Sequence, residues 1–168
     1  MVVGLVETDS KTKTQLQTAS QRAIKRIDKD FSGKMDDFWD LVFAVALEKC
    51  PVETGTLASS IRVVDGAFDP SGFSGVSVTV NGMGGYGAVE RSIVAGGEEY
   101  INPKTHGPCD YASYVEVGHM TKNGGFVEGA FFLTDALNEC EPQLDEILNG
   151  FADDVEKEFC EGSKGSPP

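Results

Sequence analysis

The fold of this chain is decided by the stretch QLQTASQRAIKRIDKDFSGKMDDFWDLVFAVALEK, residues 15–49. Its apolar residues recur at steps of three and four, which is the spacing of one helical face. They are Ile24, Ile27, Phe31, Met35, Phe38, Val42, Phe43 and Ala46. Gly33 weakens a helix by about 1 kcal/mol relative to alanine, so the pattern predicts either one bent helix or two in series. Pro51 ends the helix, because it supplies no backbone donor and pushes the preceding residue out of helical geometry.

After this helix the pattern changes to short alternating segments rich in β-branched residues. Strands are predicted over 57–64, 75–80 and 111–117, the first two joined as an antiparallel hairpin. Residues 81–107 hold several glycines and no sustained period, so a long loop is predicted there. A second amphipathic helix is predicted over 130–160, through Leu133, Leu137, Cys140, Leu144, Ile147, Phe151 and Val155.

These elements predict an α+β fold, in which a long N-terminal helix and a C-terminal helix pack on a small antiparallel β-sheet of three to four strands. A length of 168 residues with 40% apolar content suits one compact domain. We expect an N-terminal arm over 1–14, a single domain over 15–160 with its sheet over 57–118, and a disordered tail over 161–168.

Composition and charge exclude several classes of function. The formal net charge of −13 argues against a groove that grips phosphates, because nucleic-acid binders concentrate Lys and Arg. The longest wholly apolar run, around residues 43–47, is far shorter than the roughly 20 residues that cross a bilayer, so no membrane insertion is expected. The N-terminus MVVGLVETDSKTK lacks the pattern of a signal peptide, which predicts synthesis in a cytoplasm.

Three short segments stand at successive junctions between the predicted elements. They are CPVETGTLASSIRV at 50–63, YASYVEVGH at 111–119 and GAFFLTDAL at 129–137. In the first, Thr54 and Gly55 suit a sharp turn that redirects the chain from helix to strand. In the second, Glu116 is an acid among apolar neighbours. It is either a solvated residue or the partner of Arg62 in a salt bridge between strands or between subunits.

Together the three segments resemble the tail-completion, or head–tail joining, proteins of tailed phages, a family of minor tail components of the neck. In that family a helix ends in a segment like alanine-proline-valine-aspartate-threonine-glycine-x-leucine, a later strand reads like tyrosine-alanine-x-tyrosine-valine-glutamate-x-glycine, and proline-phenylalanine-leucine opens the last helix. The matching positions are Pro51, Thr54, Gly55, Leu57 and Ile61, then Tyr111, Ala112, Tyr114, Val115, Glu116 and Gly118, then Phe132 and Leu133. The chain departs from the pattern at Cys50, Glu53, Ala130 and Phe131. The resemblance spans about residues 24–159.

The resemblance implies a structural virion protein that catalyses nothing and needs no cofactor. It implies a cyclic ring, commonly a hexamer, assembled in the host cytoplasm and located at the head–tail interface of the virion. Its partners would be further copies of itself, the connector or adaptor proteins beneath the portal, and the tail terminator or tail tube protein. DNA would pass through the lumen without specific binding. A tail terminator or a portal adaptor ring is the alternative within the same class.

Two groups of residues are candidates for a place in such an assembly. The predicted loop would reach a neighbouring ring through Met83, Tyr86, Ile93, Tyr100 and Ile101, or it is an insertion of no consequence. The acidic residues of the helices either solvate helix faces or line a lumen that repels DNA. These are Asp36, Asp37, Asp153, Asp154, Glu156 and Glu158.

Cysteine and histidine offer the remaining chemistry. His106, Cys109 and His119 lie within fourteen residues and are the material for a small metal- or thiol-dependent enzyme, but their spacing lacks a fourth ligand and matches no familiar zinc site. Cys50 and Cys109, both near the ends of predicted elements, could form a disulfide within or between subunits. The alternative for the cysteines is reduced thiols without a special role.

Overall fold

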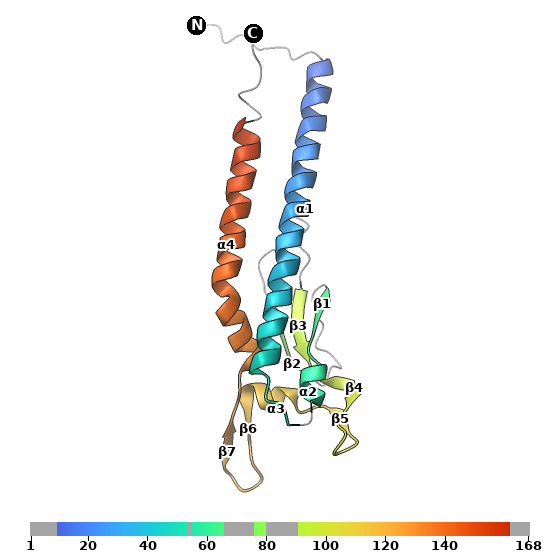
Figure 1. The fold of residues 1–168 in the computed structure, drawn as a ribbon, viewed down its shortest axis with the longest axis vertical. Helices are drawn as coiled ribbons and strands as arrows, with labels where there is room; N and C mark the ends of the chain where they lie inside the picture. The colour runs from blue at the N-terminus through green and yellow to red at the C-terminus, as the bar shows by residue number, and fades with distance from the viewer. Residues whose placement is uncertain (1–9, 54, 66–75, 80–90, 162–168) are drawn as a thin grey trace.

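The computed structural model describes residues 10–53, 55–65, 76–79 and 91–161, and two long helices dominate it. Helix α1 (Ser10–Lys49) and helix α4 (Phe132–Glu161) run side by side, and the smaller elements gather at one end of the pair (Figure 1). This confirms the predicted α+β class with a long helix at either end of the fold.

Helix α1 is a single continuous helix. It passes through Gly33 without interruption, and it begins at Ser10, within the segment expected to be an N-terminal arm. Helix α4 likewise contains Pro142 in its interior, where a proline removes one backbone hydrogen bond. Contacts elsewhere along α1 and α4 offset the unfavourable helix propensities of Gly33 and Pro142. No described helix has an apolar stretch long enough to span a membrane.

The core lies between the lower halves of the two helices and the sheet. Its buried members include Phe38, Trp39, Val42, Ala46, Ile93, Leu133, Ala136 and Cys140. Farther from the sheet along the helix pair, the ring centroids of Phe31 on α1 and Phe151 on α4 are 4.6 Å apart. Lys34 bridges to Asp154 at 3.7 Å, and Arg26 to Glu158 at 3.9 Å, across the same helix pair. The periodic apolar residues of α1 therefore hold α4 as the sequence pattern indicates.

The main sheet has three antiparallel strands in the order β1-β3-β2. Strand β3 (Arg91–Ala95) lies between β1 (Arg62–Asp65) and β2 (Val76–Thr79), with Ile93 opposite both Val63 and Val78. The prediction that the first two strands pair as a hairpin was wrong. Ser92, Ile93, Val94 and Ala95 are buried, and a short apolar run of this kind suits a central strand.

The segment predicted as one long loop, residues 81–107, also contains ordered strands. Besides β3 it includes β4 (Gly97–Ile101), which pairs with β5 (Pro108–Cys109). That prediction was wrong for 91–101, because glycine pairs such as Gly96 and Gly97, both at positive φ, mark the corner between two strands here. Residues 81–90 lie outside the described part of the chain.

Two short helices occupy places where the sequence predicted strand. Helix α2 (Thr56–Ser59) precedes β1, and helix α3 (Ala112–Val117) replaces the whole predicted strand at 111–117. In α2 the hydroxyl of Ser60 donates to the Leu57 carbonyl at 2.7 Å, which satisfies a carbonyl at the helix end. In α3 the tertiary contacts of Glu116, described below, outweigh the β-propensity of tyrosine and valine.

Candidate functional site at the base of the helix pair

The three segments that carry the family resemblance meet in one place. The first contains the end of α1 and helix α2, the second is helix α3, and the third opens α4; all lie at the lower end of the molecule in Figure 1. Leu57, Ile61, Ala112, Phe132 and Leu133 are buried there. Tyr114 is exposed, and Thr54 lies outside the described residues. We call this region the junction, comprising residues 50–53, 55–61, 111–118 and 129–134.

The carboxylate of Glu116 joins α3 to the first turn of α4. Glu116 is 2% exposed, and its Oε2 accepts from the Leu133 backbone N–H at 3.0 Å. Its Oε1 accepts from the N–H and the hydroxyl of Thr134, at 2.9 and 2.7 Å. Phe131, just before the helix, has no side-chain oxygen to cap it, so Glu116 supplies the cap from a distant segment. Its negative charge also matches the positive end of the helix dipole.

This contact corrects the predicted role of Glu116. It is neither solvated nor paired with Arg62, because its oxygens are already occupied at the start of α4. Arg62 instead bridges to Glu99 at 3.3 Å, donates to the Gly96 carbonyl at 3.2 Å and lies 5.3 Å from the centre of the Tyr100 ring. Arg62 therefore secures β4 against β1, away from the junction.

The backbones of the second and third segments touch directly. The Ala130 N–H donates to the Val115 carbonyl at 2.7 Å, and the Phe131 N–H to the Glu116 carbonyl at 3.0 Å. A Cβ on Gly129 would overlap the Glu116 carbonyl oxygen and lie 2.6 Å from the Val117 carbonyl carbon. Gly118, at φ 82°, stands in an equally close contact. Only glycine allows this approach, so the family-like Gly118 has a structural reason.

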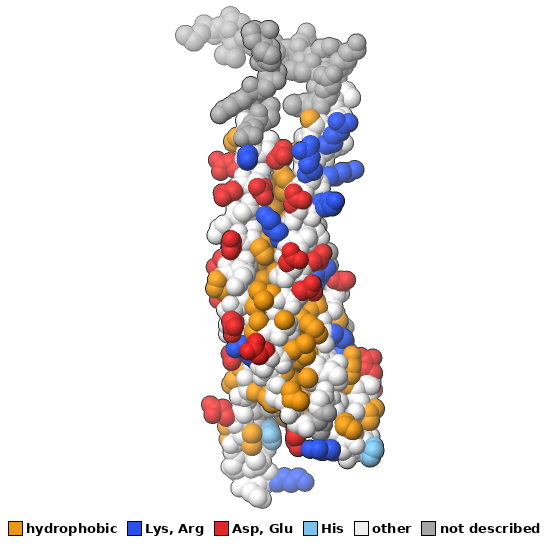
Figure 2. Space-filling view, in the orientation of Figure 1, with side chains coloured by type: hydrophobic (Ala, Val, Ile, Leu, Met, Phe, Trp, Pro, Cys, Tyr) orange, Lys and Arg blue, Asp and Glu red, His pale blue; other side chains and the backbone are white. Residues whose placement is uncertain are grey.

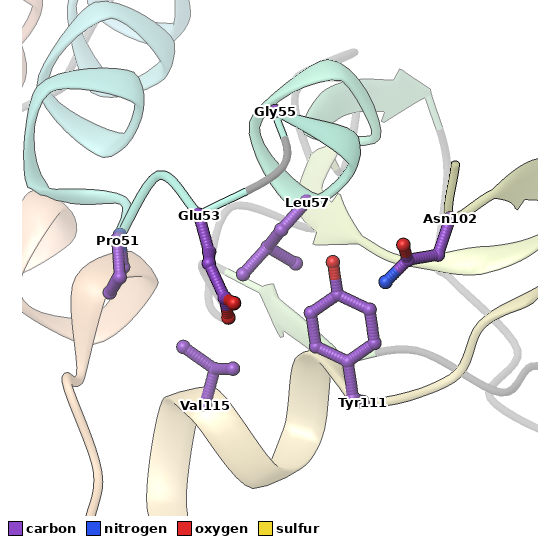
Figure 3. Close-up of a pocket in the computed structure, with 7 residues that line it drawn as sticks. All are labelled: Pro51, Glu53, Gly55, Leu57, Asn102, Tyr111 and Val115. Carbon is purple, nitrogen blue, oxygen red and sulfur yellow. The ribbon is translucent and has the colours of Figure 1, made fainter. Parts of the chain in front are cut away.

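A small hollow opens beside the junction. Its volume is about 250 Å³, and its described lining comprises Pro51, Glu53, Gly55, Leu57, Asn102, Tyr111 and Val115. In Figure 3 the side chains of Leu57, Tyr111 and Val115 point from opposite sides toward one space. Gly55, at φ 78°, turns the chain over it. Small-molecule sites usually measure about 300–1,000 Å³, so this hollow is better suited to one or two side chains.

A β-hairpin projects from the other side of α3. Strands β6 (Gly118–Met120) and β7 (Phe126–Glu128) pair only with each other among the described strands, and Thr121 closes their turn with backbone and side-chain bonds to Gly125. Met120, Phe126 and Val127 are exposed despite being apolar. We call this hairpin, residues 118–129, the arm. The sequence prediction missed it, although the pair Asn123-Gly124 between apolar residues is a strong hairpin signal.

The predicted inter-ring contact residues have separate positions. Ile93 is fully buried in β3 and is unavailable to a partner, which corrects its prediction as a contact. Tyr100 is half-buried beside Arg62, whereas Ile101 is 53% exposed. Met83 and Tyr86 lie outside the described residues.

The acidic residues of the helices are all exposed. They are Asp36, Asp37, Asp153, Asp154, Glu156 and Glu158. Three of them have a basic partner, among them Asp36, whose Oδ1 lies 2.6 Å from Nη1 of Arg91. In Figure 2 acidic side chains flank an apolar seam that runs along the helix pair. Their place on helix faces agrees with solvation, and a lumen role stays a prediction.

The cysteine and histidines considered for metal or thiol chemistry differ in burial. Cys109 is buried, and burial raises the pKa of its thiol, while side-chain hydrogen bonding with Tyr111 and Ser60 acts in the opposite direction. His106 and His119 are exposed on different loops or strands. Within the described ranges no group of three or more His, Cys, Asp or Glu side chains could hold a metal ion.

Cys50 and Cys109 are free thiols in the same core cluster. Burial, and the nearby Cys109, raise the pKa of Cys50 to about 11. Because both thiols are buried, a cross-link to another subunit would require the core to open, which disfavours the predicted inter-subunit disulfide.

In comparisons with known proteins, no family model, no curated protein and no solved structure matches this chain.

Proposed function

We propose that this chain is a structural protein of a tailed virus, one copy of a neck ring that joins the DNA-filled head to the tail tube. The observation that carries the proposal is the junction. Of the three segments that resemble the head–tail joining family, the second and third interlock through Glu116, Gly118 and Gly129. The first shares one buried core cluster with them through Leu57 and Ile61. The residues that resemble the family motifs therefore contact and position one another.

The geometry of the subunit supports a mechanical role. Glu116 fixes the start of α4 against α3, so the long helix pair is held at a defined angle to the base. A ring needs subunits of one fixed shape. Head-to-tail contacts close into a ring only when every subunit is related to the next by the same rotation. Exposed acids along α1 and α4, with a net charge of −13, would keep a passing DNA duplex from adhering.

Loss of the gene tests this role. In lysates of a virus that lacks it, electron microscopy should show filled heads and finished tails lying unattached. Overlong tails would instead indicate a tail terminator, and empty heads a portal adaptor, because DNA escapes from an unclosed portal. Normal virions would overturn the proposal.

Complementation sharpens the experiment. Plasmid-borne wild-type chain should restore joined virions, whereas Glu116→Ala should restore fewer because it weakens the junction. Glu99→Ala, which removes an exposed acid that pairs with Arg62, serves as the matched control and should restore them fully.

A further inference from the structure

The arm exposes apolar side chains that nothing in the described chain covers. Met120 is 66% exposed, Phe126 63% and Val127 45%. Next to them on α3, Tyr114 and Val117 are 56% and 57% exposed. An isolated two-stranded hairpin is marginally stable in water, and contiguous exposed apolar residues mark interaction sites. The exposed apolar residues of the arm therefore indicate an interaction surface.

The hollow of about 250 Å³ lies on a different side of the same helix. Tyr111 and Val115, one helical turn apart, line it, whereas Tyr114 and Val117 are exposed beside the arm. At 100° per residue these two pairs lie on separate faces of α3. One chain thus carries a projecting apolar surface and a receiving hollow that face in different directions. This arrangement makes head-to-tail contacts, which close into rings.

A neck ring needs contacts between copies, and the charge distribution indicates where acidic copies can meet. A chain with a net charge of −13 repels its copies over most of its surface. The arm is an exception, because Lys122 and Glu128 carry its formal charges, and these cancel. At the hollow, the carboxylate of Glu53 is paired with Lys104 at 2.9 Å. The two surfaces are therefore places where acidic copies can approach each other.

We propose that the arm of one copy docks in the hollow of the next copy, with Met120 and Phe126 as the apolar anchors. This inference rests on the proposed neck ring and adds the contact that builds it. The cross-strand neighbours Met120 and Phe126 enter beside Leu57 and Val115.

The test measures the mass of the purified full-length chain over a range of concentrations. Met120→Asp should weaken self-association at least roughly tenfold, because a central apolar anchor is lost and a charge is introduced. Lys122→Glu, at an exposed turn, should also weaken it, because it makes the near-neutral arm negative toward an acidic copy. Leu41→Asp is the matched control: it places the same new charge at an exposed apolar position of α1, 38% exposed, and should leave association unchanged.

Mixing two variants tests the direction of the contact. Val115→Phe fills the hollow and leaves the arm intact, whereas Met120→Asp damages the arm and leaves the hollow intact. Alone, each should be monomeric and folded by circular dichroism. Mixed in equal amounts, they should form a 1:1 dimer and nothing larger, because one intact arm meets one intact hollow.

Three results would overturn the inference: full-sized rings from Met120→Asp, a mixture that stays monomeric, or a native chain that is monomeric at every concentration. The lysate experiment decides the neck role separately. Rings that persist in Met120→Asp would overturn this contact and leave the neck proposal standing, whereas normal virions without the gene would overturn the neck role only.

Discussion

Replacing Glu116 with alanine is the sharpest perturbation of the junction. The change removes the acceptor of three hydrogen bonds, two from the backbone N–H groups of Leu133 and Thr134 and one from the Thr134 hydroxyl. Leu133 is fully buried, so water cannot easily replace the lost partner. The first turn of α4 is left without its cap.

The magnitude follows from these contacts. Each donor left unsatisfied costs about 1–3 kcal/mol, so two backbone donors together lower the free energy of unfolding by about 2–6 kcal/mol. At about 2–4 °C per kcal/mol for a chain of this size, the melting temperature should fall by about 4–24 °C. Glu116→Gln keeps the shape and one acceptor oxygen, so its effect should lie between those of wild type and Glu116→Ala.

Thermal melting followed by circular dichroism measures the effect. Glu99→Ala is the control, because Glu99 is an exposed acid in a surface salt bridge with Arg62 and should shift the melting temperature little. If Glu116→Ala melts within error of Glu99→Ala, the cap does not hold α4 and the reasoning is refuted.

Two glycines and the buried thiols give further predictions. Gly129→Ala should destabilise by at least about 1–3 kcal/mol, because its Cβ would overlap the Glu116 carbonyl oxygen; an unchanged urea midpoint would contradict the close approach. Gly33→Ala should instead stabilise by up to about 1 kcal/mol, because no atom lies within 4 Å of its Cβ and helices favour alanine; a lower urea midpoint would count against a continuous α1. Because the pKa of Cys50 is raised from 9.0 to about 11, the folded state keeps a proton that the unfolded state loses. Its stabilising effect is complete below about pH 9 and should be lost as pH rises toward about 11, and Cys50→Ala should flatten that part of a urea-midpoint profile. Alkylation followed by mass spectrometry should label the exposed Cys160 well before Cys50, and equal rates would mean that the core opens readily.

The sequence predicted the two long helices well. Apolar residues at steps of three and four over 35 residues leave no other regular structure that buries them together, so α1 and α4 follow from periodicity. The start of α1 at Ser10 was missed, because residues 10–14 are polar and contribute no apolar period. The first and third motif segments lie at junctions, at the end of α1 and the start of α4, whereas the second, predicted as a strand, is helix α3.

The short elements could not be predicted in the same way. A stretch of six residues such as α3 has intrinsic preferences of only fractions of a kcal/mol per residue, and tyrosine and valine favour strand. Three hydrogen bonds to a buried carboxylate outweigh that preference. For the same reason the sequence could place Glu116 only as solvated or paired with Arg62, since its true partners lie 17 and 18 residues away on another element.

The central strand β3 shows the other limit of sequence reasoning. Its buried run of Ser92 to Ala95 is too short to distinguish from a loop among glycines, and only its pairing with both β1 and β2 makes it the middle of the sheet. The sequence by itself determined the helix pair, because long periodic patterns sum many small preferences. Tertiary structure alone decided the junction and the hollow, because each depends on contacts between segments whose local preferences are weak.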